Sequence, residues 1–223
     1  MSNRVWFSSV MEDYRIGYKQ GLRAKFLGED WEPARHESSE SEKVFAAMQR
    51  HTQGYALGRH DLPEAIAVFD KKRFKLVGDL FIAGRFFAAR ERLAEVLARF
   101  DLGSGSLVPF QICQDDLKTP IEEKFYYINL GARKRTFLPT ESKSVELLVS
   151  NKETGSEIWK INSWAKDGDV ALSSAALDGP DLWVEEIVRH KLFLTEELVS
   201  SLLLAKLKID LQLTECRLME REQ

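Results

Sequence analysis

Two pairs of carboxylates near the middle of the sequence are the first residues that could carry out chemistry. Asp115 and Asp116 are followed, after a short segment containing Lys118, by Glu122 and Glu123. Two carboxylates held close together can have separated pKa values, so that one acts as a general acid and the other as a base. Adjacent acidic residues are also typical of a solvated hairpin loop. We favour the loop interpretation and predict no catalytic residue.

The four histidines could supply a general base or metal ligands, because neutral imidazole does both near pH 7. His51 and His60 are nine residues apart in a polar stretch that contains glycine, and His36 and His190 lie elsewhere in the chain. A metal site would therefore need several further ligands from distant segments. We predict surface histidines and no metal site.

The common motifs for phosphate, dinucleotide, zinc and serine-hydrolase chemistry are absent from the sequence. Gly103 and Gly105 follow a predicted helix, whereas a phosphate-binding loop opens one. We therefore predict no cofactor and no small-molecule substrate. Cys113 and Cys216 lie far apart in apolar or alternating segments, which favours two buried, reduced thiols; a single disulfide is the alternative.

The composition describes an ordinary globular protein. Of 223 residues, 44% are hydrophobic and 30% charged, and the formal net charge is -3. A general nucleic-acid binder usually carries a basic face, so this balance argues against one. The first 20 residues lack the apolar core of a secretory signal, and the chain has no apolar stretch of about 18 residues that could span a membrane. We expect a cytoplasmic protein with no nucleic-acid or membrane partner.

The periodicity of apolar residues predicts an α+β fold, with an antiparallel sheet, arranged as a meander, between flanking helices. Helices are predicted after an acidic loop near residue 42, as one turn over 63–69, and over 88–100 and 196–206, the last capped by Thr195. Strands are predicted over 5–10, 107–113, 124–130, 145–149, 157–164 and 209–214. Pro109 should keep its strand at a sheet edge, because proline cannot donate to the ladder.

Two aspects of the organisation stay open at this point. Residues 1–65 form either an amino-terminal extension or small lobe beside a core of residues 66–223, or part of one continuous domain. The segments that begin at Phe87 and Phe193 also resemble each other, since each runs from an apolar strand end through a charged cap and a helix to an alternating strand. Chance similarity and a duplicated unit both explain this pattern.

Over about two thirds of the chain, residues 70–216, the sequence resembles an immunity-protein family of bacterial polymorphic toxin systems, the eleventh-numbered of these families and formerly a domain of unknown function. The resemblance rests on the order and spacing of structural motifs, which are Asp79-Leu-Phe-Ile82, Arg90-Glu-Arg-Leu93, Phe100, Leu107-Val-Pro-Phe-Gln-Ile112, Phe125-Tyr-Tyr-Ile-Asn-Leu130, Glu141-Ser-Lys-Ser144 and Leu192-Phe-Leu-Thr-Glu-Glu-Leu198. Two positions depart from the family pattern. Ala89 replaces a usual serine, and residues 208–213 lack a usual glycine.

The resemblance implies a non-catalytic antidote that binds a cognate toxin, one to one, in the producing cell. The toxin would be delivered by type VI secretion or by cell contact. Many toxins act on anionic substrates and present a basic cleft, so an acidic segment is a candidate contact. The predicted partner-binding residues come from segment 29–42, which has six acidic side chains, and are Glu29, Asp30, Trp31, Glu32, Glu37, Glu40 and Glu42. The alternatives are an adaptor unrelated to toxins and an accessory enzyme that uses the carboxylates of residues 115–123.

Overall fold

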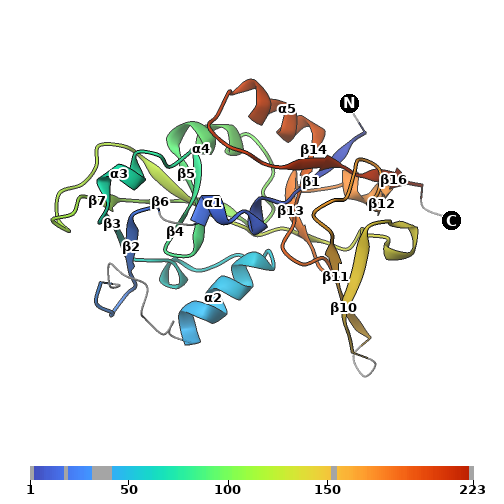
Figure 1. The fold of residues 1–223 in the computed structure, drawn as a ribbon, viewed down its shortest axis with the longest axis horizontal. Coiled ribbons are helices and arrows are strands. Elements are labelled where there is room, and N and C mark those ends of the chain that lie inside the picture. Colours follow the sequence, from blue (N-terminus) through green and yellow to red (C-terminus); the bar gives the residue numbers. More distant parts are fainter. Residues whose placement is uncertain (1–2, 18–19, 32–41, 152–154, 221–223) are drawn as a thin grey trace.

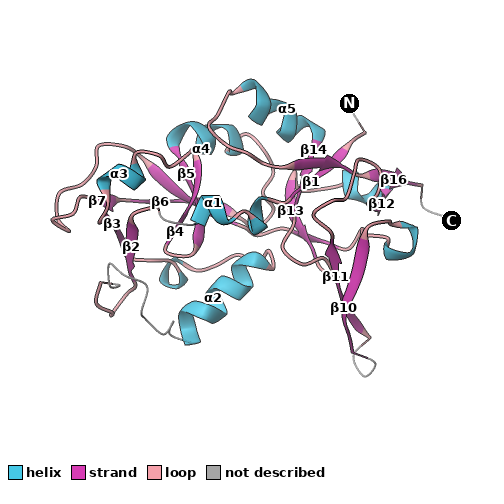
Figure 2. Ribbon diagram, in the orientation of Figure 1, coloured by secondary structure: helices cyan, strands magenta, loops and turns pink. Residues whose placement is uncertain are grey.

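The computed structural model describes residues 3–17, 20–31, 42–151 and 155–220, and it confirms the predicted α+β class. Figure 1 shows an elongated molecule in which two main sheets lie next to each other along the long axis, with both chain termini at one end. Helices α4 (Glu91–Leu97) and α5 (Glu196–Leu204) lie together on one side. Helix α2 (Glu42–Thr52) and a projecting hairpin lie on the opposite side (Figure 2).

The first main sheet has four antiparallel strands in the order β4-β5-β8-β6. These strands are β4 (Leu80–Ala83), β5 (Phe86–Arg90), β8 (Phe125–Asn129) and β6 (Ser106–Phe110). Helix α4 begins directly after β5. Pro109 lies in the edge strand β6, which confirms that prediction.

The second main sheet has five strands in the order β15-β1-β14-β13-β9. These strands are β15 (Leu213–Glu215), β1 (Val5–Ser8), β14 (Leu192–Thr195), β13 (Leu182–Glu185) and β9 (Arg133–Lys134). Helix α5 begins directly after β14, and the side-chain oxygen of Thr195 accepts a hydrogen bond from the Leu198 N–H. Thr195 is therefore the helix cap that the sequence predicts.

The two main sheets repeat one arrangement of elements. In each, a hairpin (β4-β5 or β13-β14) leads directly into a helix (α4 or α5) and then into a strand (β6 or β15). A fourth strand is inserted between that last strand and the hairpin; it is β8 in the first sheet and β1 in the second. The two helices pack in one apolar cluster. The sequence similarity between the segments at Phe87 and Phe193 therefore corresponds to a structural repeat.

Each repeat is joined to the other by the same pair of hydrogen bonds. Asp79, just before β4, donates its N–H to the Lys208 carbonyl at 3.0 Å, and its Oδ2 accepts from the Lys208 N–H at 2.5 Å. Asp181, just before β13, donates its N–H to the Asp101 carbonyl, and its Oδ2 accepts from the Asp101 N–H, both at 2.8 Å. Lys208 and Asp101 each lie four residues after the last residue of the helix in the opposite repeat.

Three smaller sheets complete the strand pairing. They are β2-β3-β7 (Leu22–Lys25, Ala65–Val68 and Ile112–Cys113), the hairpin β10-β11 (Val145–Asn151 and Ser156–Ile161), and the parallel pair β12-β16 (Ala171–Ser173 and Arg217–Met219). The remaining helices are α1 (Tyr14–Gly17), α3 (Lys71–Phe74) and the short 3-10 turns Val10–Glu12, Arg59–Asp61, Pro139–Glu141 and Ser174–Leu177.

Several predictions of local structure are wrong. Residues 63–69 contain strand β3, not a helical turn, and the predicted helix 88–100 begins only at Glu91 because Ala88 and Ala89 are fully buried in β5. The predicted meander of three strands does not form: β6 pairs with β8, but β7 pairs with β3 and β10 with β11. The closing strand begins at Leu213, four residues later than predicted from Ile209. In each case pairing with distant segments overrides the local pattern.

The first 65 residues share sheets with later parts of the chain. Strand β1 lies between β14 and β15, and β2 pairs with β3, which spans the predicted boundary at residue 65. The division into a lobe and a core stays a prediction, but the described amino-terminal strands are integral parts of two sheets.

His51 is a core residue, so the prediction that the histidines lie at the surface is wrong for this one. Its ring is 1% exposed and lies 5.4 Å from the Phe86 ring and 5.6 Å from the Phe87 ring, centroid to centroid. Nε2 accepts a hydrogen bond from the Phe87 N–H at 3.4 Å, and Nδ1 has no partner. Burial lowers the pKa of His51 from 6.5 to about 4.

This burial predicts a loss of stability at mildly acidic pH. Because the folded-state pKa of His51 lies below its unfolded value, its contribution is complete above pH 6.5 and is lost as the pH falls toward 4. We expect the free energy of unfolding to fall by about 2–3 kcal/mol from this group across that window. Urea titrations of the protein and of His51→Gln at several pH values measure it. Equal pH dependence in both proteins would contradict the assignment.

The reciprocal hydrogen bonds predict that Asp79 contributes more to the stability of the fold than an exposed aspartate does. Asp79→Ala removes the acceptor for the Lys208 N–H and should lower the free energy of unfolding by about 1–3 kcal/mol. Asp79→Asn keeps a side-chain oxygen and should lose less. The exposed Asp30→Ala is the matched control in urea denaturation. The idea fails if Asp79→Ala is as stable as that control.

Candidate functional site

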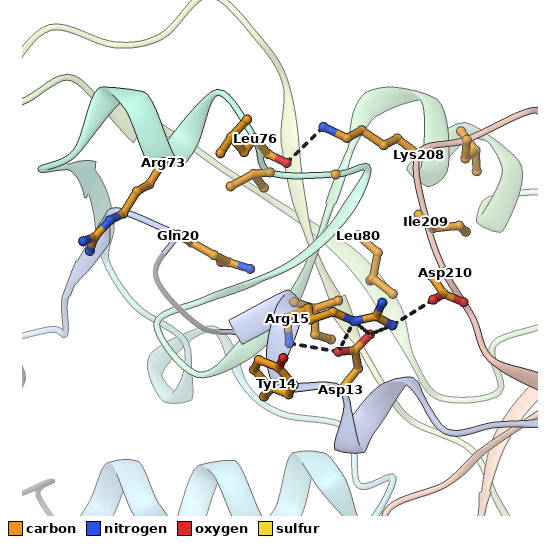
Figure 3. Close-up of a pocket in the computed structure, with 14 residues that line it drawn as sticks. Asp13, Tyr14, Arg15, Gln20, Arg73, Leu76, Leu80, Lys208, Ile209 and Asp210 are labelled. Atoms are coloured by element: carbon orange, nitrogen blue, oxygen red, sulfur yellow. Dashed lines mark hydrogen bonds and ion pairs between the residues drawn. The ribbon is translucent and has the colours of Figure 1, made fainter. Parts of the chain in front are cut away.

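An open groove of about 750 Å³ lies where the two repeats meet. Its walls come from residues 13–16 and Gln20, which follow β1, from residues 73–80, which run from α3 into β4, and from residues 207–210, which follow α5. Figure 3 shows side chains from these three distant segments facing one another across the groove. Clefts between structural units are common binding sites, so we take this groove as the candidate functional site.

The groove has an apolar floor and an exposed apolar rim. The floor side chains are partly or fully buried and are Ile16, Val77, Leu80, Leu207 and Ile209. Tyr14 and Leu76 on the rim each keep 74% of their surface exposed. Exposed tyrosine and leucine beside an apolar floor provide a surface that another molecule can desolvate.

Charged side chains at one end of the groove hold each other in place. Arg15 donates to Asp13 Oδ2 at 2.7 Å and to Asp210 Oδ2 at 2.8 Å, so it bridges the segments before α1 and after α5 (Figure 3). Gln212 Nε2 also donates to Asp13 at 2.8 Å. The hydrogen bond from Arg15 is the main cause that lowers the pKa of Asp13 below its usual value. Asp13 is therefore ionised and fixed.

The opposite rim is basic. Lys208 Nζ donates to the Leu76 carbonyl at 3.0 Å, which joins the two sides of this rim (Figure 3). Arg73 pairs with Asp70 at 3.1 Å, and Asp70 also caps α3 by accepting from the Lys72 and Arg73 N–H groups. The short helix that carries these basic side chains ends two residues before the exposed Leu76.

Gln20 is an exception among the polar residues that line the groove. Its side chain is 8% exposed, and its amide oxygen is buried without a hydrogen-bond partner. Figure 3 shows its amide extending toward the space between Leu76 and Leu80. A buried amide without a partner costs free energy, so the groove contains a polar group that a bound molecule could satisfy.

The predicted acidic contact lies elsewhere, and only part of it falls within the described residues. Glu29 and Asp30 are exposed in a turn after β2, and Glu42 is exposed at the start of α2. Trp31 is half-buried, with the Arg23 guanidinium 5.7 Å from its ring centroid. Glu32, Glu37 and Glu40 lie outside the described residues. The acidic contact therefore stays a prediction.

Three of the four carboxylates of residues 115–123 have separate partners. Asp116 accepts hydrogen bonds from Thr119 and from two backbone N–H groups, which lowers its pKa to about 2. Asp115 pairs with Lys71 at 2.9 Å, which lowers its pKa, and Glu123 pairs with Arg90. This arrangement fits the loop interpretation.

The cysteines and the other histidines have varied environments. Cys216 is buried and Cys113 half-buried, and both thiols are free. Burial raises the pKa of each thiol. His60 is exposed, His190 is half-buried, and His36 lies outside the described residues.

A second cleft, of about 480 Å³, lies between α2 and β11. Its floor includes Glu185, whose carboxylate accepts hydrogen bonds from the backbone of Thr136 and Phe137 and from the Trp183 indole at 3.0 Å. Burial raises the pKa of Glu185 despite these bonds. The Arg133 guanidinium donates to the Tyr55 hydroxyl at 2.6 Å and lies 4.1 Å from the Tyr55 ring centroid. These polar groups serve the fold, so we favour the first groove as the site.

The groove could not have been found from the sequence alone. Its three segments are separated by more than fifty residues at each step, and no motif marks them. The residue pair Gly78-Asp79 favours a break in the chain before β4, but it does not reveal the partner segment at Lys208.

Comparison of the chain with protein-family models and with curated proteins finds no match to either. Among the described residues, no group of three or more His, Cys, Asp or Glu side chains is placed to hold a metal ion. No helix in the described ranges is both long enough and apolar enough to cross a membrane. The resemblance to the immunity family thus stays a prediction.

Proposed function

We propose that this protein is a non-catalytic immunity protein that binds and neutralises a cognate toxin in the cytoplasm of the producing cell. The toxin would reach that cell by type VI secretion or by cell contact, and the complex would contain one copy of each protein. The observation that carries the proposal is the groove between the repeats, with exposed Tyr14 and Leu76 above an apolar floor. The resemblance of residues 70–216 to the immunity-protein family suggests that the partner is a toxin.

The composition of the groove favours a protein partner over a small metabolite. Binding hot spots in protein interfaces combine aromatic and arginine side chains with a desolvated apolar centre. Tyr14, Arg15 and Leu76 provide such a combination on one open surface. Arg15 is already fixed by two carboxylates, so little side-chain entropy is lost when a partner covers it.

An adaptor unrelated to toxins is the second candidate function, since the same groove would suit any protein ligand. The partner's identity separates the two. An immunity protein has its toxin encoded beside it, and its binding abolishes the toxin's activity. An adaptor would leave its partner active.

The proposal predicts protection by co-expression. The toxin domain encoded beside this chain should kill cells when expressed alone and should be tolerated, and co-purify, when this protein is present. Tyr14→Ala combined with Leu76→Ala should weaken the complex by about 30-fold, because two interface anchors are lost. Trp164→Ala combined with Val149→Ala removes exposed apolar side chains outside the groove and is the matched control.

Two outcomes would count against the proposal. Continued killing despite stable co-expression, without co-purification, would remove the immunity function. Equal affinity of the groove variant and the control variant would leave the function standing but place the contact elsewhere. Urea denaturation of both variants shows whether each remains folded.

The predicted acidic contact has its own test. Glu29→Lys combined with Asp30→Lys reverses two exposed charges without touching the groove. If this segment faces a basic cleft, the association rate should fall by about 10-fold at low salt, and less at high salt, because exposed charges mainly steer encounter. Stopped-flow or biosensor kinetics measure it. An unchanged rate at low salt would remove the segment from the interface.

A further inference from the structure

We propose that the groove receives an acidic segment of the partner protein, with an apolar side chain in the groove and carboxylates against the basic rim. The inference rests on the proposed function and specifies the chemistry of the partner's contact. It concerns a surface different from the acidic segment 29–42.

The first support is the local charge. Segments 71–75 and 206–208, which flank Leu76 and Lys208, contain six basic residues and no acidic residue; these are Lys71, Lys72, Arg73, Lys75, Lys206 and Lys208. Two of them have acidic partners, since Lys71 pairs with Asp115 and Arg73 with Asp70. Within the ranges that the structure describes, no ion pair joins the other four lysines to a carboxylate. Of the six, Arg73 and Lys208 line the groove, and Lys72, Lys75 and Lys206 are exposed one residue away from lining residues in the sequence. Asp70 and Asp210 lie within two residues of these segments, but neither forms an ion pair with the four lysines. A protein of net charge -3 thus carries a cluster of lysines without ion-pair partners beside the groove.

The second support is the apolar centre of this rim. Leu76 is 74% exposed between Lys75 and the Lys208 side chain that bonds to its carbonyl. Tyr14, on the wall formed by the segment after β1, is also 74% exposed. A partner that offered only charge would leave these apolar surfaces in water. A segment that also carries an apolar side chain removes them from water.

The third support is Gln20, inside the groove. The residue is more than nine-tenths buried, and its amide oxygen has no partner. A side-chain amide both donates and accepts, as a peptide group does, so it can pair with the main chain of an extended segment. This favours a polypeptide in the groove.

The opposite end of the groove argues against a polyanion without apolar side chains. Asp13 and Asp210 line that end, and both are bonded to Arg15. A nucleic-acid backbone or a lipid headgroup layer would place phosphates against these carboxylates as well as against the lysines. A protein segment can confine its carboxylates to the basic rim.

The test uses the full chain and the toxin domain encoded beside it. Lys72→Glu combined with Lys75→Glu should weaken the complex at least about 10-fold at low salt, and Lys72→Arg combined with Lys75→Arg should retain the affinity because it retains the charge. Lys160→Glu, an exposed reversal on β11, is the matched control and should change affinity little. None of these side chains takes part in the hydrogen bonds between Asp79 and Lys208, so the fold should persist.

Carbodiimide coupling identifies the partner segment directly, because it joins a lysine amine to a carboxylate only where the two are in contact. Mass spectrometry should find cross-links from the rim lysines to one acidic segment of the toxin that also contains an apolar residue. Vesicles of phosphatidylglycerol and a single-stranded oligonucleotide serve as competing ligands and should bind at least about 10-fold more weakly than the toxin.

The outcomes separate the two proposals. If the wild-type protein binds the toxin but the glutamate variant matches the Lys160→Glu control, the inference is overturned and the immunity function stands. The glutamate substitutions could weaken binding of the vesicles or the oligonucleotide and leave the affinity for the toxin unchanged. The rim would then bind another anion, and the inference would again be overturned. If the wild-type protein does not bind the toxin, both proposals fall.

Discussion

The hydrogen bonds of Asp79 and Asp181 to the opposite repeat are the constraint on which the rest of the structure depends. Each residue pairs with the backbone of the segment that leaves the other repeat's helix. Its carbonyl accepts from the N–H of the last residue of its own hairpin, Arg90 or Thr195, at 3.0 Å. These backbone groups would otherwise be left without partners as the repeats come together. One residue type at equivalent positions thus fixes the strand start, the helix start and the contact between the repeats.

The contacts of Asp79 with Lys208 and of Asp181 with Asp101 form two equivalent junctions between the repeats. The groove lies at the Asp79 junction, where the neighbouring chain segments pack differently from those at the Asp181 junction. At the Asp181 junction, the chain after β8 packs directly on residues 102–105; a Cβ on Gly131 would lie 2.1 Å from Gly105 N, so only glycine permits this approach. At the Asp79 junction, residues 207–212 contain no glycine, and the chain after β1 turns away into α1. The segments meet at the Asp79–Lys208 bonds, at Gly78, where a Cβ would lie 2.3 Å from the Lys208 carbonyl oxygen, and at the bond from Arg15 to Asp210. The groove lies between these contacts.

The sequence correctly predicts structural features that depend on local chemistry. Its predictions are wrong where pairing with distant strands determines the secondary structure. Thr195 as a helix cap and Pro109 at a sheet edge follow from the chemistry of one residue, and both are confirmed. Ala88 and Ala89 suit a helix locally, but they lie in β5 because β4 and β8 flank them. The groove could not be predicted, because Asp13, Leu76 and Lys208 come together only when the two repeats pack against each other. The strand inserted in the second sheet, β1, also comes from the opposite end of the chain from the strands that it pairs with.

A buried charge and a buried amide near the groove are treated differently by the fold. Lys191 is fully buried, yet its ammonium group donates to Ser9 at 3.0 Å and to Glu12 at 2.6 Å. The fold therefore satisfies this buried charge. The oxygen of Gln20 has no such partner, and the neighbouring rim keeps lysines and an exposed leucine together. A surface that combines an unsatisfied buried amide, lysines without ion-pair partners and exposed apolar area gains free energy when another protein covers it, which is the physical basis for placing the partner there.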